Sequence, residues 1–163
     1  MGRFSYLNLH ALMPGVAQPF YVGTFRHTLD AKNRLTIPAK WRFAGDDEQE
    51  VYLALPHPGG YVLVLPPAEV AKLYERISTL PLSDPKAQEF QHKFFSQAHQ
   101  FGCDKQGRIN LPEALLRRAG IDRDVVLVGT LNKFGLWSAE RWAPLDPEQN
   151  GDNLGDLMRQ VGL

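Results

Sequence analysis

The chain has 163 residues, and its 18 Lys and Arg residues balance its 18 Asp and Glu residues, so the formal net charge is zero. This balance excludes attraction of a polyanion by the overall field of the protein, so a nucleic-acid interface must depend on where the charges are placed. The single cysteine, Cys103, excludes an internal disulfide and suits a reducing compartment, and no stretch approaches the ~20 apolar residues of a membrane span.

Residues 1–19 contain a partly apolar run. A signal peptide is disfavoured because only Arg3 precedes the run and polar residues and a proline interrupt it. We expect a flexible N-terminal extension, with Met13 as an alternative start to Met1.

Residues 30–34 (DAKNR) have the chemistry of a tight turn between strands and are called the first turn. Residues 24–29 lead in, and residues 34–37 lead out with alternating apolar and polar side chains, as in a strand. A three-residue hairpin loop needs a left-handed backbone at its last position, and Asn33 is the residue type that best replaces Gly there. The pattern therefore predicts a β-hairpin.

A short helix and two strands are expected next. Pro38 and Gly45 bracket the helical stretch, since Pro suits the first helical position and Gly the position after the end. Residues 51–55 and 61–65 then have the composition of strands.

Two longer helices are predicted after the strands. The first has apolar residues at the i, i+3, i+4, i+7 spacing of a helix face, namely Val70, Leu73, Tyr74 and Ile77. The second begins at Asp84, a capping residue that is followed by a proline, and it carries Phe90, Phe94 and Phe95.

Residues 104–108 (DKQGR), the second turn, repeat the first turn 74 positions later, with Gly107 in the place of Asn33. The repeat continues through a helix from Pro112 to Gly120, through residues 125–129 at the same offset, and through residues 134–137 at an offset of 73. We interpret it as a duplicated module of hairpin, short helix and two strands. The expected organisation is an extension (1–19), a first module (20–66), connecting helices (67–96), a second module (97–142) and a C-terminal tail (143–163).

Basic residues gather near the turns, whereas acids gather after residue 145. One interpretation is that Asp30 with Arg34, and Asp104 with Arg108, close their turns as surface ion pairs. The other is that Asp fixes the turn while Arg matches guanine O6 and N7, and a neighbouring Lys neutralises phosphate. Spacing alone does not decide between these interpretations, and both can hold together.

Motifs of enzymes and metal sites are scarce. The chain has no phosphate-binding P-loop, nucleophile elbow or zinc-binding helix motif, and no metal site is expected at His92 and His99, which lack further ligands nearby. We expect Trp41, Trp137 and Trp142 to pack in a core rather than to stack on bases. The chain is therefore not expected to be an enzyme or to bind a cofactor or a small-molecule substrate.

Three features together strongly resemble the bacterial MraZ proteins over roughly residues 20–142: FYVG at residues 20–23 followed by HTLD, the doubled D-x-x-x-R, and NKFGLW at residues 132–137. The resemblance implies an α+β, β-rich fold. In it, two duplicated AbrB-like swapped-hairpin modules with short helices form one barrel-like, pseudo-symmetric unit. It also implies a cytoplasmic, nucleoid-associated regulator that assembles into a ring. Such a regulator binds short G-rich direct repeats in front of the division and cell-wall operon, usually as a repressor.

The resemblance assigns roles to individual residues. The expected contacts to double-stranded DNA come from Lys32, Arg34, Lys105 and Arg108, and, on charge and proximity in sequence only, from Arg26, Lys40 and Arg42. The residues expected to shape the loops are Asp30, Asn33, Asp104 and Gly107. Asn33 replaces the glycine usual in the family, which the turn chemistry accommodates.

Related folds also serve two other functions. AbrB-like antitoxins use the same hairpins to hold a toxin, but such chains usually carry one module rather than two. A related decarboxylase barrel makes its cofactor by cutting a Gly-Ser bond, and this chain contains no Gly-Ser pair.

Overall fold

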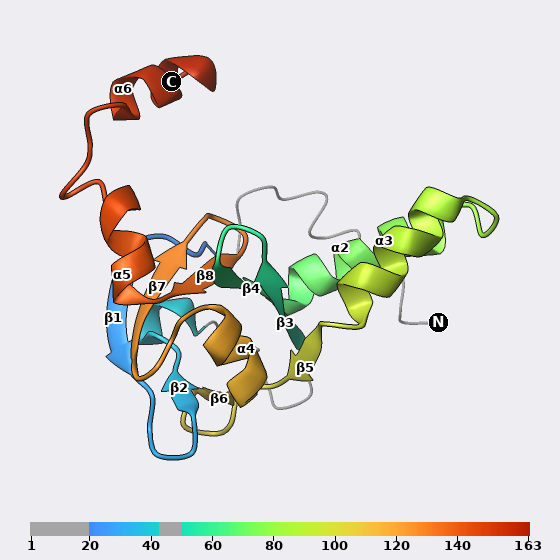
Figure 1. The fold of residues 1–163 in the computed structure, drawn as a ribbon, viewed down its shortest axis with the longest axis horizontal. Coiled ribbons are helices and arrows are strands. Elements are labelled where there is room, and N and C mark those ends of the chain that lie inside the picture. The colour runs from blue at the N-terminus through green and yellow to red at the C-terminus, as the bar shows by residue number, and fades with distance from the viewer. Residues whose placement is uncertain (1–19, 43–49) are drawn as a thin grey trace, which may run out of the picture.

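The computed structural model describes residues 20–42 and 50–163, so the expectations for residues 1–19 and for the end of the first short helix lie outside the described residues. The chain folds as an α+β protein with antiparallel strands and mostly short helices (Figure 1). The elements in chain order are β1 (Thr24–Thr28), β2 (Arg34–Thr36), η1 (Ala39–Trp41), β3 (Tyr52–His57), β4 (Tyr61–Leu65), α2 (Pro67–Ser78), α3 (Pro85–Phe95), β5 (His99–Phe101), β6 (Arg108–Asn110), α4 (Glu113–Arg118), β7 (Asp124–Gly129), β8 (Phe134–Trp137), α5 (Ala139–Trp142), η2 (Ala143–Leu145) and α6 (Leu154–Gln160).

The strands form two antiparallel sheets. The larger has six strands in the order β1-β7-β8-β4-β3-β5, and β2 pairs with β6 in a separate two-stranded ribbon. Exchanging β1 with β5, β3 with β7 and β4 with β8 gives the same strand order read from the opposite edge of the sheet. The first strand of each repeat thus pairs with the third strand of the other repeat.

Because the strands pair between the repeats, only the turn of each predicted hairpin forms as expected. The first turn is closed by hydrogen bonds from Asp30 N to Arg34 O and from Asn33 N to Asp30 O, both 3.0 Å. Beyond it, β1 pairs with β7 and β2 with β6, so the lead-in and lead-out strands do not pair with each other, contrary to the hairpin prediction. The pairing of β2 with β6 still satisfies the backbone hydrogen-bonding groups of both strands. It also places Leu35 and Ile109 in the buried core under the ribbon.

The registers correct the alignment of the repeat. Phe25 lies opposite Leu127, and His99, its counterpart at offset 74, lies opposite Ala54. The third strands therefore correspond at an offset of 73, not 74, as Leu127 and Ala54 show. Leu136 pairs with Leu127 as Val64 pairs with Ala54, so the fourth strands correspond at an offset of 72. The second repeat is thus one residue shorter before its third strand and one shorter in the following loop.

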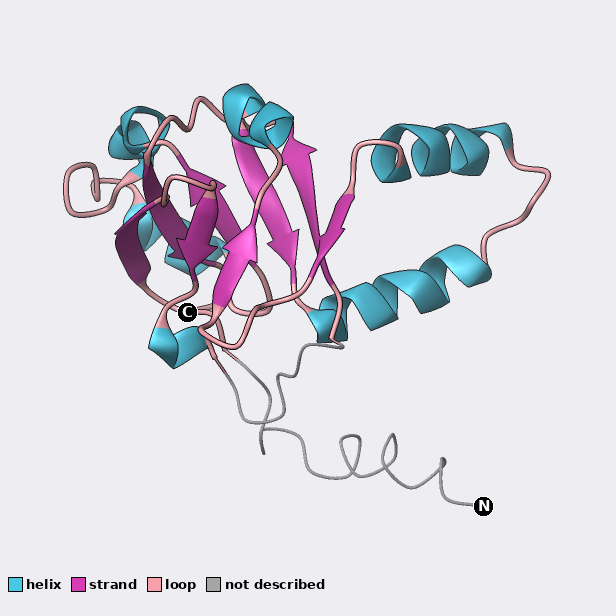
Figure 2. Ribbon diagram, turned by 90° about the horizontal axis from the view of Figure 1, so that it is seen from below, coloured by secondary structure: helices cyan, strands magenta, loops and turns pink. Residues whose placement is uncertain are grey.

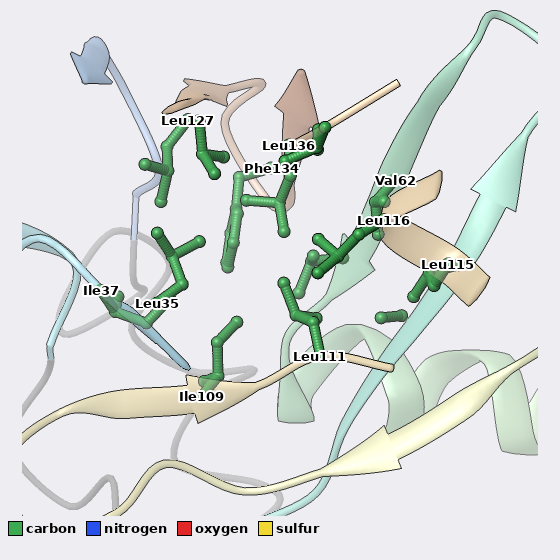
Figure 3. Close-up of a cluster of buried hydrophobic side chains, with 14 of the residues drawn as sticks. Leu35, Ile37, Val62, Ile109, Leu111, Leu115, Leu116, Leu127, Phe134 and Leu136 are labelled. Carbon is green, nitrogen blue, oxygen red and sulfur yellow. The ribbon is translucent and has the colours of Figure 1, made fainter. Parts of the chain in front are cut away.

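The core lies between the six-stranded sheet and the β2–β6 ribbon, and α4 closes one side (Figure 3). Leu35 and Ile109 come from the ribbon, Phe134 and Leu136 from the sheet, and all four are at most 1% exposed. Full burial of such side chains stabilises a fold by about 1.5–3 kcal/mol each. The three tryptophans are buried, as predicted: Trp41 packs edge-on against Phe25 with ring centroids 5.1 Å apart, and Trp137 packs against Trp142.

The expected barrel is not found in the described residues. Within them β1 and β5 are the open edges of the large sheet, and the ribbon is a separate layer rather than a continuation of it. Closure would require a hydrogen-bonded neighbour at both edges. The two layers enclose the core without forming a closed barrel.

The two longer helices confirm their predictions and form a projecting arm. Asp84 caps α3, its side chain accepting a hydrogen bond from Lys86 N at 3.0 Å. Helices α2 and α3 extend together away from the sheets in both views (Figure 1, Figure 2). In the described segments no helix has the length and apolar character to cross a bilayer.

Candidate nucleic-acid interface

The two turns have matching hydrogen-bond networks. In the first turn Asp30 Oδ1 accepts hydrogen bonds from Lys32 N and Arg34 N, both at 2.9 Å, and Oδ2 accepts one from Arg34 Nε at 2.6 Å. In the second turn Asp104 accepts the equivalent bonds, from Gln106 N and Arg108 N at 2.9 Å and from Arg108 Nε at 2.8 Å. Each aspartate thus accepts three hydrogen bonds from its own turn.

These contacts stabilise the charged form of both aspartates. The backbone N–H of Arg34, together with its guanidinium and the N–H of Lys32, lowers the pKa of Asp30 below its ordinary value of 3.8. The backbone N–H of Arg108 does the same to the pKa of Asp104, with support from the Arg108 guanidinium and Gln106 N. Both carboxylates remain ionised at neutral pH, and each turn keeps its ion pair.

The last loop position has the left-handed backbone that the sequence predicts. The φ angle is +58° at Asn33 and +75° at Gly107. Each of these residues also accepts a hydrogen bond across the pseudo-symmetry: Ile37 N donates to Gly107 O at 2.8 Å, and Leu111 N donates to Asn33 O at 3.3 Å. The two turns are consequently fixed to one another and not only to their own repeat.

The ribbon between the turns has one apolar and one polar face. Leu35 and Ile109 lie opposite each other and face the core. The outward face carries the alternate residues of both strands, Arg34, Thr36, Arg108 and Asn110. Arg34 is opposite Asn110, and Arg108 is opposite Thr36, so the two arginines are diagonal neighbours with Cα atoms ~7–8 Å apart.

Each arginine on this face is held at one atom and open at the others. Its Nε donates to the turn aspartate, whereas Nη1 and Nη2 make no hydrogen bond within the described residues. The side chains keep 31% exposure at Arg34 and 28% at Arg108, so the planar ends are positioned and still accessible. Such ends can donate two parallel hydrogen bonds to a base edge or a phosphate.

The remaining predicted contacts fall into three groups. Lys32 and Lys105 are exposed at the tips of the two turns, and Lys40 is exposed on η1. Arg42 reaches the second turn, where its Nη1 donates to Gln106 O at 3.3 Å. Arg26 instead forms an ion pair with Asp146 at 3.4 Å, which holds it at the C-terminal segment.

Sequence reasoning did not single out Thr36 and Asn110. They occupy the outward positions next to the arginines on the ribbon, where their polar side chains complete the face. The signal was present, since each stands two residues after its arginine, and side chains two apart on a strand share a face. Among residues 20–42 and 50–163, no group of three or more His, Cys, Asp or Glu side chains could hold a metal ion.

Comparison with known proteins identifies relatives along most of the chain. Residues 94–154 match the profile of the family described as "MraZ protein, putative antitoxin-like". The chain is 34% identical over 145 residues to the transcriptional regulator MraZ of Halothermothrix orenii, covering 88% of this chain and 99% of that protein. It is 35% identical over 143 residues to the transcriptional regulator MraZ of Lachnoclostridium phytofermentans, covering 88% and 98%. It is also 38% identical over 124 residues to that of Limosilactobacillus fermentum, covering 76% and 84%. With identity above 30% over nearly the full length of the first two relatives, the chain belongs to the MraZ family.

Proposed function

We propose that this protein is a transcription regulator that binds double-stranded DNA with the outward face of the β2–β6 ribbon and the two turns. Relatives covering most of the chain are named transcriptional regulators. The observation that carries the proposal is the diagonal pair Arg34 and Arg108, each held by an aspartate on a two-stranded antiparallel ribbon. The major groove of B-DNA, ~12 Å wide, admits such a ribbon.

The division of labour follows from the contacts. Arg34 and Arg108 read guanine edges with their free Nη groups, because Nε is already fixed and little side-chain freedom is lost on binding. Lys32 and Lys105, at the exposed tips, neutralise phosphates, and Arg42 adds positive charge beside the second turn. Asp30, Asn33, Asp104 and Gly107 shape the loops. Arg26 is the least suited of the proposed contacts, since Asp146 neutralises it.

The proposal includes the family's mode of action. The chain forms a homo-oligomer, in which two swapped AbrB-like modules make up each protomer, and binds short G-rich direct repeats upstream of its own gene. It thereby represses the division and cell-wall operon as a cytoplasmic, nucleoid-associated protein without enzymatic activity. Repeated sites suit an oligomer, because a second protomer binds at high effective concentration once the first is engaged.

Fluorescence anisotropy can test the proposal with a labelled duplex from upstream of the gene and a scrambled duplex of equal composition. The wild-type protein should prefer the upstream duplex, and Arg34→Ala and Arg108→Ala should each lose about 1–3 kcal/mol on it and less on the scrambled one. Arg76→Ala is the matched control, because Arg76 is exposed on α2, in the arm that projects away from the ribbon and the turns (Figure 1). Equal binding to both duplexes would contradict sequence-specific regulation. Absence of DNA binding would favour the antitoxin-type protein-interaction role.

A further inference from the structure

The C-terminal helix α6 carries an apolar stripe that nothing in the described chain covers. Its apolar residues follow the i, i+3, i+4, i+7 spacing of one helix face, and they are 43% to 73% exposed: Leu154, Leu157, Met158 and Val161. The helix has seven residues, and isolated helices shorter than ~12–15 residues are marginal in water. A helix this short with this stripe therefore depends on a docking surface.

A groove of about 510 Å³ with apolar walls lies at the base of the α2–α3 arm. Its walls come from Leu55 and Pro56 at the end of β3 and from Phe90 and Phe94 on α3. Phe90 is 44% exposed and stacks on Phe94 with ring centroids 5.0 Å apart. The arm is poorly covered elsewhere too, since α2 has no buried residue and Ala87 is the buried residue of α3.

The stripe and the groove lie at opposite ends of the molecule. Figure 1 shows α6 beyond α5 at one end of the long axis and the arm at the other. The chain before α6 is anchored at Asp146, which is buried and accepts a hydrogen bond from Arg26. Helix η2 ends directly before Asp146, so no loop precedes this anchor. A helix held there meets the groove of a second copy, not its own.

The charges around the two surfaces are complementary. The rim of the groove carries two basic residues, Lys86 and Lys93, and one acidic residue, Glu89, which gives it a net charge of +1. The segment 147–163 carries Glu148, Asp152 and Asp156 against Arg159, a net charge of −2. Helix α6 itself is neutral, because Asp156 pairs with Arg159, so the excess acid lies in the segment that leads into it, at Glu148 and Asp152. An amphipathic helix that lays its apolar face into a hydrophobic groove is an established mode of recognition.

We infer that α6 of one protomer docks in the groove between β3 and α3 of the next protomer, joining copies of this chain head to tail. The inference rests on the oligomer included in the proposed function and specifies the contact between its protomers, which is called the joint below. Such a contact uses two different surfaces of each copy, so it is heterologous and generates a ring if the rotation closes or a filament if it does not. The DNA-binding turns take no part in it.

Substitutions on each surface test the joint, with light scattering after size-exclusion chromatography at micromolar concentration. Leu157→Asp places a charge in the stripe, and Phe90→Asp places one in the groove; both side chains are exposed enough for the fold to survive, which thermal melts check. Each variant should elute as a monomer of 18.4 kDa, whereas the wild type elutes as a multiple of that mass. The matched controls, Gln160→Asp on the polar side of α6 and His92→Asp on α3 away from the groove, should keep the oligomer.

Mixing the two variants separates this joint from its alternatives. An equimolar mixture of Leu157→Asp and Phe90→Asp retains one intact helix and one intact groove per pair, so it should give a dimer of 36.8 kDa, twice 18.4 kDa. If α6 paired with α6, the Phe90→Asp variant alone would stay associated, and if arm paired with arm, the Leu157→Asp variant alone would. Either result, or a mixture that stays monomeric, would overturn the inference. Wild-type-like oligomers for both single variants would overturn it as well.

A DNA arm distinguishes failure of the joint from failure of the proposed function. Both variants should bind a duplex with one repeat as the wild type does, and should lose about 10²-fold or more on a duplex with several repeats. A monomeric wild type that still prefers upstream DNA would refute the oligomer and with it the joint, but would leave the DNA-binding site intact.

Discussion

Gly107→Val probes the backbone demand of the second turn. Gly107 has φ +75°, in the left-handed region, and holding a β-branched residue there costs about 1–3 kcal/mol. A Cβ at this position would also lie 2.5 Å from Arg42 Cδ and 2.6 Å from Arg42 Nη1. The Arg42 side chain is exposed and can swing away, so we expect backbone strain to dominate and the clash to add little.

Gly107→Asn is the matched control, because Asn33 adopts φ +58° at the equivalent position of the first turn. Gly107→Asn should lower the free energy of unfolding much less than Gly107→Val does, by on the order of 1 kcal/mol or less, since Asn tolerates the left-handed region. Urea unfolding at one fixed protomer concentration measures both, as oligomerisation makes stability concentration-dependent. Equal losses for Val and Asn would refute the strain argument. Rescue of Gly107→Val by Arg42→Ala would show instead that the clash is the main cost.

Three further predictions concern charge. Lys32→Ala and Lys105→Ala should weaken binding to upstream and scrambled duplexes alike and reduce the salt slope by about 1 each, as lost phosphate contacts do; a change confined to the upstream duplex in anisotropy titrations would contradict this. Arg42→Ala should weaken DNA binding more than Arg26→Ala, because Arg42 lies at the second turn and Arg26 is paired with Asp146; the reverse order in the same assay would argue against the interface. Asp30 and Asp104 have lowered native pKa values, so their contribution to stability is present above about pH 3.8 and is lost as the pH falls through the native pKa values. The Asp30→Asn/Asp104→Asn double variant lacks these two carboxylates, so its free energy of unfolding should fall less steeply below pH 4 than that of the wild type. Acid titrations followed by circular dichroism measure this difference.

Local chemistry made the turns and helix starts predictable. Asn33 and Gly107 have the left-handed backbone expected of the last loop position, and Asp84 caps α3 as its position before a proline indicates. In each case the residues that determine the conformation are a few positions apart, so their side-chain and backbone preferences act without the rest of the fold.

Contacts between distant segments were not predictable in the same way. The pairing of β1 with β7, the two slips in the repeat and the reach of Arg42 to a turn 64 residues away depend on how the repeats pack. Strand periodicity assigns a face to each residue but does not choose the partner strand. Tyr61, aligned in sequence with Phe134, shows the consequence: Tyr61 stacks on Trp137 on the outer face, whereas Phe134 lies in the core.

The two interpretations of the Asp–Arg pairs do not exclude each other, because they use different atoms. Asp30 takes Nε of Arg34 and two backbone N–H groups, which closes the turn, while the Nη groups stay accessible on the ribbon face. An exposed ion pair contributes only about 0–1 kcal/mol to stability, so losing the arginine should hardly affect folding. Losing the aspartate would remove the acceptor of those backbone N–H groups and also release the arginine it positions. The carboxylate is thus the structural member of each pair, and the arginine is the member free to contact DNA.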